Sequence, residues 1–414
     1  MSNECWNVER GGNLFKQAKR PVQEGDETIT AFRNGVVTLR SNVRTDGFTN
    51  SIVDAGYQHI SKDDLVIHGM DSFAGAIGVS DADGKGSPIL IPLVPLRDDA
   101  NPHFYAYYMR NLAGKGYISS LGQGIRIRSV DFKYNKFKAI KMPHPPIAIQ
   151  NEIVAKLDDK TQNIDSQIAL LKTKLTRLDE YKTALIHNAV TKGLDANGCR
   201  ILDGTPASEI KWKPSGVEWI GDIPIEANST NGKPFMFSKK EVNKRMERTN
   251  VLSLTLNGVI TKDLSDMGGL LPSDYSTYQY FNKGDLVFKL IDLENQKTSR
   301  VGKVHEDGIM SPAYIRMIPT GDICLDYQYF WFYSLYRSMI FNGLAGNGVR
   351  NAIGKEDLIR LPFVEWNKDE ASAIANFLSR KVELIDKLSS VVENKIGKLV
   401  EYKKSLINEV MSGA

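Results

Sequence analysis

The 38 residues from Ile153 to Val190, IVAKLDDKTQNIDSQIALLKTKLTRLDEYKTALIHNAV, recur without a gap as Ile374 to Met411, IANFLSRKVELIDKLSSVVENKIGKLVEYKKSLINEVM. The two copies lie 221 residues apart. Identical positions include Asp165 with Asp386 and the run Glu180-Tyr181-Lys182 with Glu401-Tyr402-Lys403. Because self-similarity at a fixed offset marks a duplicated structural unit, this pair of segments is the starting point for the fold.

Both copies carry a heptad pattern of apolar residues. In the first copy one series is Leu157, Ile164, Leu171, Leu178 and Leu185, and the other is Val154, Thr161, Ile168, Leu175 and Lys182. In the second copy the series are Leu378, Ile385, Val392, Leu399 and Leu406, and Ala375, Val382, Ser389, Ile396 and Lys403. Five heptads indicate a coiled coil, with helices of about 57 Å at 1.5 Å per residue. Such a helix cannot bury its apolar stripe alone, so each copy is the expected partner of the other.

The repeat extends upstream with a weaker match and drifting offset. Corresponding pairs are Asp64-Leu65-Val66 with Asp285-Leu286-Val287, Gly122-Gln-Gly124-Ile-Arg126 with Gly346-Asn-Gly348-Val-Arg350, and Ile140-Lys-Met-Pro143 with Ile359-Arg-Leu-Pro362. Short apolar runs predict strands at 64–67, 89–94, 285–290 and 313–318, and aromatic clusters near 103–108 and 327–332 predict short helices. A mixed domain followed by a long helix therefore occurs twice.

These patterns predict an α+β chain with an internal pseudo-two-fold repeat, in which two mixed α/β domains are separated by two long helices. The expected boundaries are 1–148 for the first mixed domain, 149–192 for the first helix, 193–226 for a connector, 227–365 for the second domain and 366–414 for the second helix. The connector is assigned from its density of glycine and proline.

Composition narrows the class of protein. The chain has 414 residues and a formal net charge of +4, which excludes a polycationic coat but permits local DNA-binding patches. Three scattered cysteines do not form a disulfide framework or a zinc site. The sequence shows no signal peptide and no apolar stretch of the length a bilayer requires, so we expect a cytoplasmic protein.

Two short motifs suggest catalysis and are better explained otherwise. Asn101-Pro102-His103-Phe104 is close to the Asn-Pro-Pro-Tyr/Phe loop of amino-methyltransferases, but a glycine-rich cofactor loop does not precede it, and Asn101 is expected to cap a helix. The Glu-Tyr-Lys runs resemble part of a nuclease metal site, but both lie on heptad helices, where a solvated face or a partner contact is expected. The sequence predicts no catalytic residue and no metal site in this chain.

The polar features that remain suit DNA binding. Lysine and arginine hold phosphates, while arginine and asparagine read guanine and adenine edges. The candidate DNA-binding residues are Arg40, Asn42, Arg44, Arg126, Arg128, Lys239, Lys240, Lys244, Arg245, Arg350 and Asn351. Four turn glycines, Gly122, Gly124, Gly346 and Gly348, precede the paired arginines. They either let the backbone approach a ligand or close a turn.

On these residues the sequence resembles the specificity subunit of type I restriction–modification systems. The resemblance is carried by the duplicated unit, by the proline-led helix PHPPIAIQNEIVAKLDDKTQNID, by Ala189-Val-Thr-Lys-Gly-Leu194 after it, and by Ser215-Gly-Val-Glu-Trp-Ile-Gly-Asp-Ile-Pro224. It covers essentially the whole chain as architecture, whereas the mixed domains themselves match weakly.

The resemblance implies two target-recognition domains on an antiparallel helix pair, each reading one half of a split, asymmetric DNA site. It implies two modification subunits, which methylate adenine and carry S-adenosylmethionine, docked on the helices, and ATP- and Mg-dependent restriction subunits that join them. No cofactor is expected on this chain. The alternatives left open by the residues are a coiled-coil protein-binding scaffold without DNA specificity and a DNA enzyme in its own right.

Overall fold

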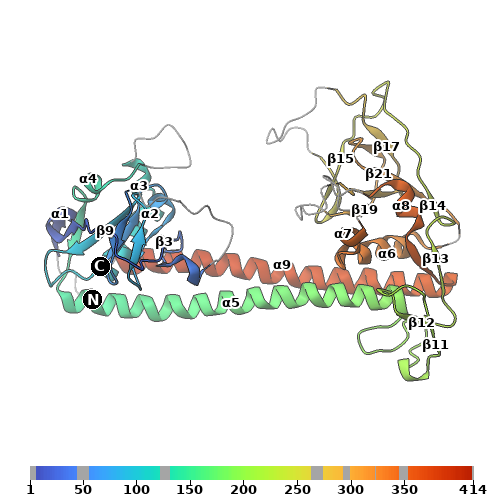
Figure 1. Ribbon diagram of the computed structural model, residues 1–414, viewed down its shortest axis with the longest axis horizontal. Helices are drawn as coiled ribbons and strands as arrows, with labels where there is room; N and C mark the ends of the chain where they lie inside the picture. The colour runs from blue at the N-terminus through green and yellow to red at the C-terminus, as the bar shows by residue number, and fades with distance from the viewer. Residues whose placement is uncertain are drawn as a thin grey trace. The chain divides into compact units, whose positions relative to one another are not determined.

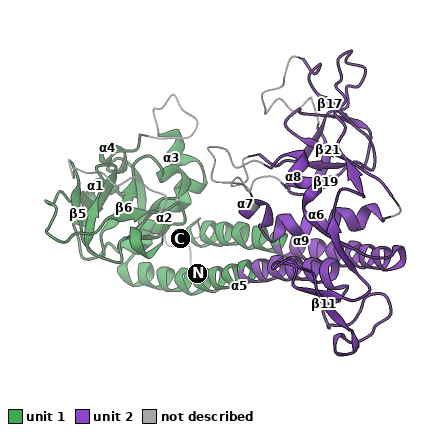
Figure 2. Ribbon diagram, turned by 45° about the vertical axis from the view of Figure 1, so that its right-hand side comes forward, with its two compact units in different colours: residues 1–172, 393–414 green, residues 173–392 purple. Residues whose placement is uncertain are grey.

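The computed structural model describes residues 6–43, 56–121, 131–262, 274–291, 299–321, 323–344 and 353–412. The chain divides into two compact units (Figure 2). Unit 1 comprises residues 1–172 and 393–414, and unit 2 comprises residues 173–392. Each unit therefore combines one mixed domain with one part of each long helix.

The mixed domain of unit 1 is built from short antiparallel strands and short helices (Figure 1). Its strands are β1 (Asn7–Arg10), β2 (Phe15–Gln17), β3 (Ile29–Ala31), β4 (Val37–Leu39), β5 (Gln58–Ile60), β6 (Leu65–His68), β7 (Ile77–Val79), β8 (Gly84–Gly86), β9 (Leu90–Pro95) and β10 (Lys141–His144). Its helices are α1 (Gly11–Leu14), η1 (Arg40–Asn42), η2 (Ser72–Ala74), α2 (Pro102–Gly114), α3 (Tyr117–Ser120) and α4 (Tyr134–Phe137).

Unit 2 has the same kinds of elements, preceded by a connector that contains one helical turn and a hairpin. Its strands are β11 (Trp212–Pro214), β12 (Asp222–Pro224), β13 (Asn228–Asn231), β14 (Met236–Phe237), β15 (Leu252–Thr255), β16 (Gly258–Thr261), β17 (Gln279–Phe281), β18 (Leu286–Phe288), β19 (Val301–Lys303), β20 (Gly308–Met310), β21 (Ile315–Pro319) and β22 (Pro362–Glu365). Its helices are η3 (Ala207–Glu209), α6 (Leu325–Arg337), α7 (Ile340–Leu344) and α8 (Lys355–Arg360).

The two mixed domains share one topology. The four-stranded sheet β2-β9-β6-β7 of unit 1 corresponds to β14-β21-β18-β19 of unit 2. The pairs β1-β10, β3-β4 and β5-β8 correspond to β13-β22, β15-β16 and β17-β20, and every pair is antiparallel. The domains are thus duplicates in strand order even where their sequences have diverged, and the predicted internal repeat is confirmed.

Local sequence explains the elements that were predicted. The central strands β6 and β18 are the apolar runs LVIH and LVF, whose leucine, valine, isoleucine and phenylalanine side chains are all buried. Helix α2 begins where Asn101 accepts a hydrogen bond from the backbone N–H of His103 at 2.8 Å, and Pro102 fits the first helical turn. The aromatic clusters form α2 and α6, whose rings lie in the cores of their units.

The long helices are α5 (Ile147–Lys192) and α9 (Lys368–Ser412), which are antiparallel to each other (Figure 1). All of the heptad positions predicted to form the core are buried or half-buried, including Leu157, Ile164, Leu171, Leu178, Ile385, Val392 and Leu399. The predicted fold class, with two mixed domains and a coiled-coil helix pair, is confirmed.

Two matching ion pairs join the helices. In unit 1, Lys403 Nζ lies 2.6 Å from Asp165 Oδ2, and in unit 2, Lys182 Nζ lies 2.6 Å from Asp386 Oδ1. The same offset of 221 residues relates the two pairs. Both lysines stand at heptad core positions, where the stem covers apolar surface while the ammonium group reaches an aspartate on the other helix. A heptad slip would separate both pairs, so they help to fix the register of the helices.

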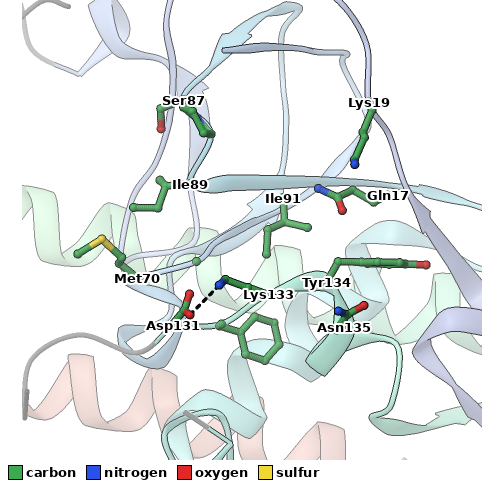
Figure 3. A pocket seen from close by; sticks show the side chains of 13 residues that line it. Gln17, Lys19, Met70, Ser87, Ile89, Ile91, Asp131, Lys133, Tyr134 and Asn135 are labelled. Carbon is green, nitrogen blue, oxygen red and sulfur yellow. Dashed lines mark ion pairs between the residues drawn. The ribbon is translucent and has the colours of Figure 1, made fainter. Parts of the chain in front are cut away.

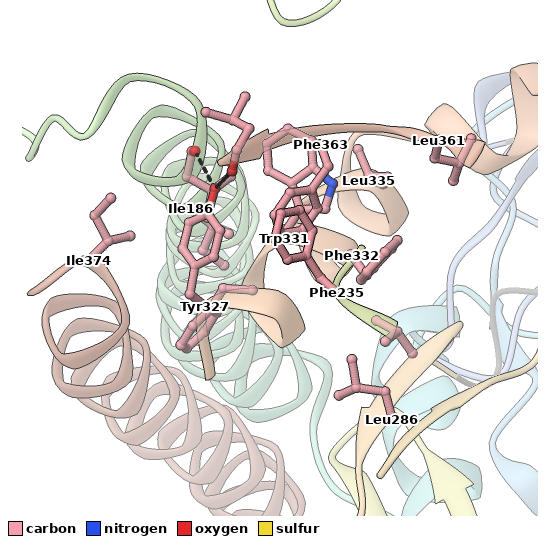
Figure 4. Packing of buried hydrophobic residues seen from close by; sticks show 14 of the residues in the cluster. Ile186, Phe235, Leu286, Tyr327, Trp331, Phe332, Leu335, Leu361, Phe363 and Ile374 are labelled. Carbon is pink, nitrogen blue, oxygen red and sulfur yellow. Dashed lines mark hydrogen bonds between the residues drawn. The ribbon is translucent and has the colours of Figure 1, made fainter. Parts of the chain in front are cut away.

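The core of unit 2 also holds the ends of the helices in place (Figure 4). The Tyr327 hydroxyl is fully buried and donates to the carbonyl of Val364 at 2.6 Å, with the Val190 carbonyl 3.1 Å away. The Trp366 indole N–H donates to the same Val190 carbonyl at 3.1 Å. From the connector, Arg200 pairs with the buried carboxylate of Glu370 at 2.7 Å. These bonds satisfy polar groups at the end of α5 and the start of α9 that would otherwise be buried without partners.

Candidate nucleic-acid groove

A hollow of about 920 Å³ opens on the sheet of the unit 1 domain (Figure 3). One side is formed by Gln17 at the end of β2 and by Lys19, and the other by residues 131–135, which lead into α4. Ile89 and Ile91 lie between them, with Met70 at one end. A second hollow of about 450 Å³ shares Gln17, Lys19 and Pro88 with the first and adds residues 56–58. We call the two together the unit 1 groove.

A glycine lets three segments meet at this groove. Gly69 donates its N–H to the Ile89 carbonyl at 2.8 Å and accepts from the N–H of Phe132 at 3.0 Å. A Cβ atom at position 69 would lie 3.0 Å from both the Ile89 and the Phe132 carbonyl oxygens. The close approach of these backbones therefore requires a residue without a side chain, and it holds Lys133 and Asn135 opposite Gln17.

The charge of the groove is positive on balance. Lys19 is exposed and, within the part of the chain that the structure describes, makes no hydrogen bond or ion pair. Lys133 is exposed and lies 3.0 Å from Asp131, an exposed pair whose attraction is weak in water. Burial lowers the pKa of the neighbouring His68, so its ring is neutral at pH 7 and adds no charge.

This arrangement has the chemistry of a surface that reads a duplex. The ammonium groups of Lys19 and Lys133 can hold phosphates. The side-chain amides of Gln17 and Asn135 can each present a donor and an acceptor, which is the pattern that reads the edge of adenine. The apolar floor of Ile89, Ile91 and Met70 suits contact with a thymine methyl group.

The predicted residues Arg40 and Asn42 lie elsewhere in unit 1, on η1 after β4. The Arg40 guanidinium donates to the Thr30 hydroxyl at 3.3 Å, and the exposed Asn42 amide donates to the Thr38 hydroxyl at 2.9 Å. Both side chains thus brace the β3–β4 hairpin, and neither lines the unit 1 groove.

The predicted basic run of unit 2 is largely exposed. Lys239 and Lys240 follow β14 just as Lys19 and Arg20 follow β2, so they occupy the topologically equivalent place in the second domain. Lys239 pairs with Glu241 at 2.7 Å, while Lys244 and Arg245 lie further along the same exposed loop. The role of these residues in DNA binding stays a prediction.

The other predicted site residues lie outside the described residues. These are Arg44, Arg126, Arg128, Arg350 and Asn351, together with the turn glycines Gly122, Gly124, Gly346 and Gly348.

Sequence reasoning missed the four polar residues of the unit 1 groove. A signal was present, because Lys16-Gln17-Ala18-Lys19-Arg20 is a basic run and Lys133-Tyr134-Asn135-Lys136 is another. Both runs are short, and they lie more than a hundred residues apart in the sequence. Only the tertiary structure places them across one groove, through the strand order of the sheet and the backbone bond between Phe132 and Gly69.

The motifs that suggested catalysis have structural roles. The side-chain oxygen of Asn101 accepts the hydrogen bond from the His103 N–H that caps α2. Its side-chain NH2 group donates to the side-chain oxygen of Asn151 on α5 at 2.7 Å, so both polar atoms of the side chain are hydrogen-bonded. Lys182 and Lys403 of the Glu-Tyr-Lys runs form the ion pairs between the helices.

No group of three or more metal-ligating side chains occurs among the described residues. In the same residues no helix is both long and apolar enough to cross a membrane.

Fold and site together define an internally duplicated chain in which two mixed α/β domains share one antiparallel helix pair. No family model matches the sequence. A solved structure described as "Structural basis underlying complex assembly and conformational transition of the type I R-M system" contains a chain that is similar over 98% of this chain and 97% of its own length, with a TM-score of 0.66 and 12% identity. This match shows that the two chains share a fold.

Two further structures match at lower TM-scores. The HsdS subunit from Thermoanaerobacter tengcongensis matches with a TM-score of 0.46 and 13% identity, covering 99% of this chain and 96% of that one. The S subunit of a type I restriction–modification system from M. genitalium matches with a TM-score of 0.41 and 13% identity, covering 99% and 97%.

Proposed function

We propose that this chain is the DNA sequence-specificity subunit of a type I restriction–modification complex. It reads a bipartite, asymmetric DNA site with its two mixed domains and directs adenine methylation and cleavage by partner subunits. The observation that carries this proposal is the complete duplication of domain topology on a shared helix pair. Such an arrangement suits two half-sites separated by a gap.

The unit 1 groove supports the DNA-reading role over the alternative of a protein-binding scaffold. A surface that binds only protein has no need for two lysines and two amides around a small apolar floor, whereas each of these groups has a partner in a duplex. The proposed partners are double-stranded DNA, two modification subunits and restriction subunits. S-adenosylmethionine, ATP and Mg would be bound by those subunits, and the complex would act in the cytoplasm.

A methylome tests this proposal directly. N6-methyladenine would be mapped across the source genome with and without this gene. We expect one split, asymmetric motif to lose its methylation when the gene is deleted and to regain it on complementation. A methylome that is unchanged when the gene is expressed together with its neighbouring methyltransferase would refute the proposal.

The groove residues give a prediction about one half-site. Lys19→Ala with Lys133→Ala is expected to weaken DNA binding by the assembled complex on all sequences and to reduce the slope of log K against log salt by about 1 to 2, because up to two phosphate contacts are lost. Gln17→Ala or Asn135→Ala is expected to relax the sequence requirement at one half-site only, by about 1–3 kcal/mol. Binding would be measured by fluorescence anisotropy over a range of salt concentrations.

Lys16→Ala is the matched control. Lys16 is exposed on the same strand as Gln17, but successive side chains of a strand point to opposite faces. It should therefore leave binding unchanged. If Lys16→Ala weakened binding as much as the Lys19 and Lys133 pair did, the loss would reflect net charge and the groove would not be the reading surface.

A further inference from the structure

A loop of unit 2 holds an exposed methionine in a backbone conformation that methionine rarely adopts. The loop comprises residues 242–248, between β14 and β15, and we call it the Met246 loop. Met246 has a φ angle of 52°, and its side chain is 54% exposed. In this left-handed region Cβ crowds the backbone, so glycine usually occupies it. Local stability therefore does not favour a methionine at this position.

A buried asparagine holds the two ends of the loop together. The Asn243 side chain is fully buried, and its NH2 group donates to the Arg248 carbonyl at 2.8 Å. Its side-chain oxygen accepts from the Arg248 N–H at 3.2 Å. The backbone carbonyl of Asn243 accepts from the Met246 N–H at 2.9 Å. One residue thus closes the loop and bonds to the left-handed position at its tip.

Arg248 fixes the closed loop to the sheet. Its guanidinium group donates to the Phe281 carbonyl at 3.2 Å and to the Asn282 side-chain oxygen at 2.8 Å. It also lies over the ring of Tyr280, 5.0 Å from the ring centre. A strained residue persists only where its surroundings impose the conformation, and such residues cluster at functional sites. The loop therefore presents Met246 in one rigid position.

Two cations flank the exposed methionine. Lys244 and Arg245 are exposed, and the Arg245 side chain is 87% exposed. Glu247 lies 3.8 Å from Arg245, a distance at which an exposed pair attracts weakly in water. Proteins that kink DNA insert an apolar side chain, methionine included, between base pairs, and cations beside it hold the phosphates. The tip of the Met246 loop has this combination.

The Met246 loop begins at the counterpart of the unit 1 groove. In unit 1 the His59 N–H donates to the Arg20 carbonyl at 3.0 Å, and in unit 2 the Tyr280 N–H donates to the Glu241 carbonyl at 2.7 Å. Each pair of equivalent residues is 221 positions apart. Because Arg20 lines the second hollow of the unit 1 groove, the two loops leave their domains beside equivalent surfaces.

The corresponding loop of unit 1 lacks the side chain and the cations. Residues 21–27 read PVQEGDE, and the left-handed residue there is Gly25, with a φ angle of 87°. Glycine has no side chain to insert, and the exposed carboxylates of Glu24 and Glu27 repel phosphates. The methionine tip is thus a property of unit 2 alone.

We propose that the Met246 loop inserts the Met246 side chain between two base pairs of the half-site that unit 2 reads, while Lys244 and Arg245 hold the neighbouring phosphates. This deepens the proposed function and rests on it. The half-site of unit 2 is kinked, whereas that of unit 1 stays stacked. The kinked step is a pyrimidine–purine step, because such steps unstack most easily.

DNA is favoured over a protein as the ligand of this loop. A stable protein interface buries about 800 Å² on each partner, far more than one methionine supplies. A wedge in DNA needs only one side chain, because the stacked bases on either side cover it.

Fluorescence of 2-aminopurine, which rises when the base is unstacked, tests the inference. The probe would replace each base of both half-sites in turn, in a duplex that carries the motif given by the methylome, bound to the assembled complex. We expect the wild type to raise the fluorescence at one step of one half-site. Met246→Gly is expected to lose this rise while its thermal unfolding temperature stays equal or increases, because glycine accepts the positive φ angle. Extrusion of the target adenines should raise the fluorescence equally in both proteins.

A mismatch at the same step supplies a gain-of-binding test. It weakens stacking beforehand, so it should tighten binding by the wild type about tenfold and leave binding by Met246→Gly nearly unchanged. Leu256→Ala is the matched control, because Leu256 is 56% exposed in the turn between β15 and β16 and lies outside the Met246 loop. It should behave as the wild type does in both assays.

Three results would overturn the inference. The first is an equal fluorescence rise with wild type and Met246→Gly at every position. The second is a loss with Leu256→Ala as large as the loss with Met246→Gly. The third is a Met246→Gly variant that binds DNA normally but loses a modification subunit in native mass spectrometry, which would make the loop a protein contact. Each of them leaves sequence-specific methylation in place, whereas failure of the proposed function would abolish it, so the two are distinguishable.

Discussion

Arg316→Met is expected to destabilise the mixed domain of unit 2 by about 3–5 kcal/mol, because it leaves a buried carboxylate without its counter-charge. Arg316 Nε lies 2.6 Å from Asp285 Oδ2, and its terminal nitrogen lies 2.8 Å from Glu241. The side chains of Arg316 and Asp285 are only 3% and 6% exposed. Thermal unfolding of the full-length chain, with hydrogen exchange of β18 and β21, would measure the loss.

The first domain supplies the matched control. Asp64 is the repeat equivalent of Asp285, but its partner is Arg20, whose side chain is 31% exposed. Asp64 itself is only 4% exposed, but the Arg20 guanidinium lies at the solvent boundary. Arg20→Met is expected to cost less, because water can take the place of the guanidinium next to the Asp64 carboxylate. Adding Asp285→Asn to Arg316→Met removes the unpaired charge and should recover part of the stability. An Arg316→Met variant that unfolds like the wild type would show that the pair contributes little.

Under the proposed function, removing one heptad from each long helix is expected to abolish modification of the natural DNA site and to create modification of a site with the same half-sites and a shorter gap. The deletion takes residues 170–176 from α5 and 391–397 from α9, which are repeat equivalents. Each helix loses two turns, about 10 Å of rise, while the heptad phase is kept. The half-sites should be unchanged because the deletion leaves both mixed domains intact. A methylome of cells that express the variant with its partners would give the new motif.

Two controls separate a change of spacing from damage to the helix pair. Insertion of an extra heptad at the same points should lengthen the gap, which is the opposite of the change expected for the deletion. Deletion from α5 alone leaves the helices unmatched in length and should abolish modification without creating a new motif. If the double deletion kept modifying sites with the original gap, the helices would not set the spacing.

The sequence predicted the parts of this protein that depend on short-range periodicity. The heptads identified α5 and α9, and the residues that they placed in the core are buried or half-buried. Asn101 was expected to cap a helix and does so. Such features depend on residues two to seven positions apart, so the chain encodes them locally.

The residues that line the unit 1 groove were not predicted from such local patterns. Arg40 and Asn42 were predicted to bind DNA because they are polar and lie in a turn-rich run. Their side chains bond to threonines of the β3–β4 hairpin, and their role in DNA binding stays a prediction. Gln17 and Asn135 were not among the predicted site residues, yet they lie across one groove. Residue type alone does not distinguish a side chain that braces a hairpin from one that lines a hollow, because the difference lies in what surrounds it.

By itself the sequence determined that the chain is duplicated, that each half ends in a long heptad helix, and that the two helices need each other to bury their stripes. The tertiary structure alone decided which arginine neutralises Asp285 and which residues face each other across the unit 1 groove. The physical reason is the range of the interactions. Helix periodicity is set within a few residues, whereas strand order brings together segments more than a hundred residues apart.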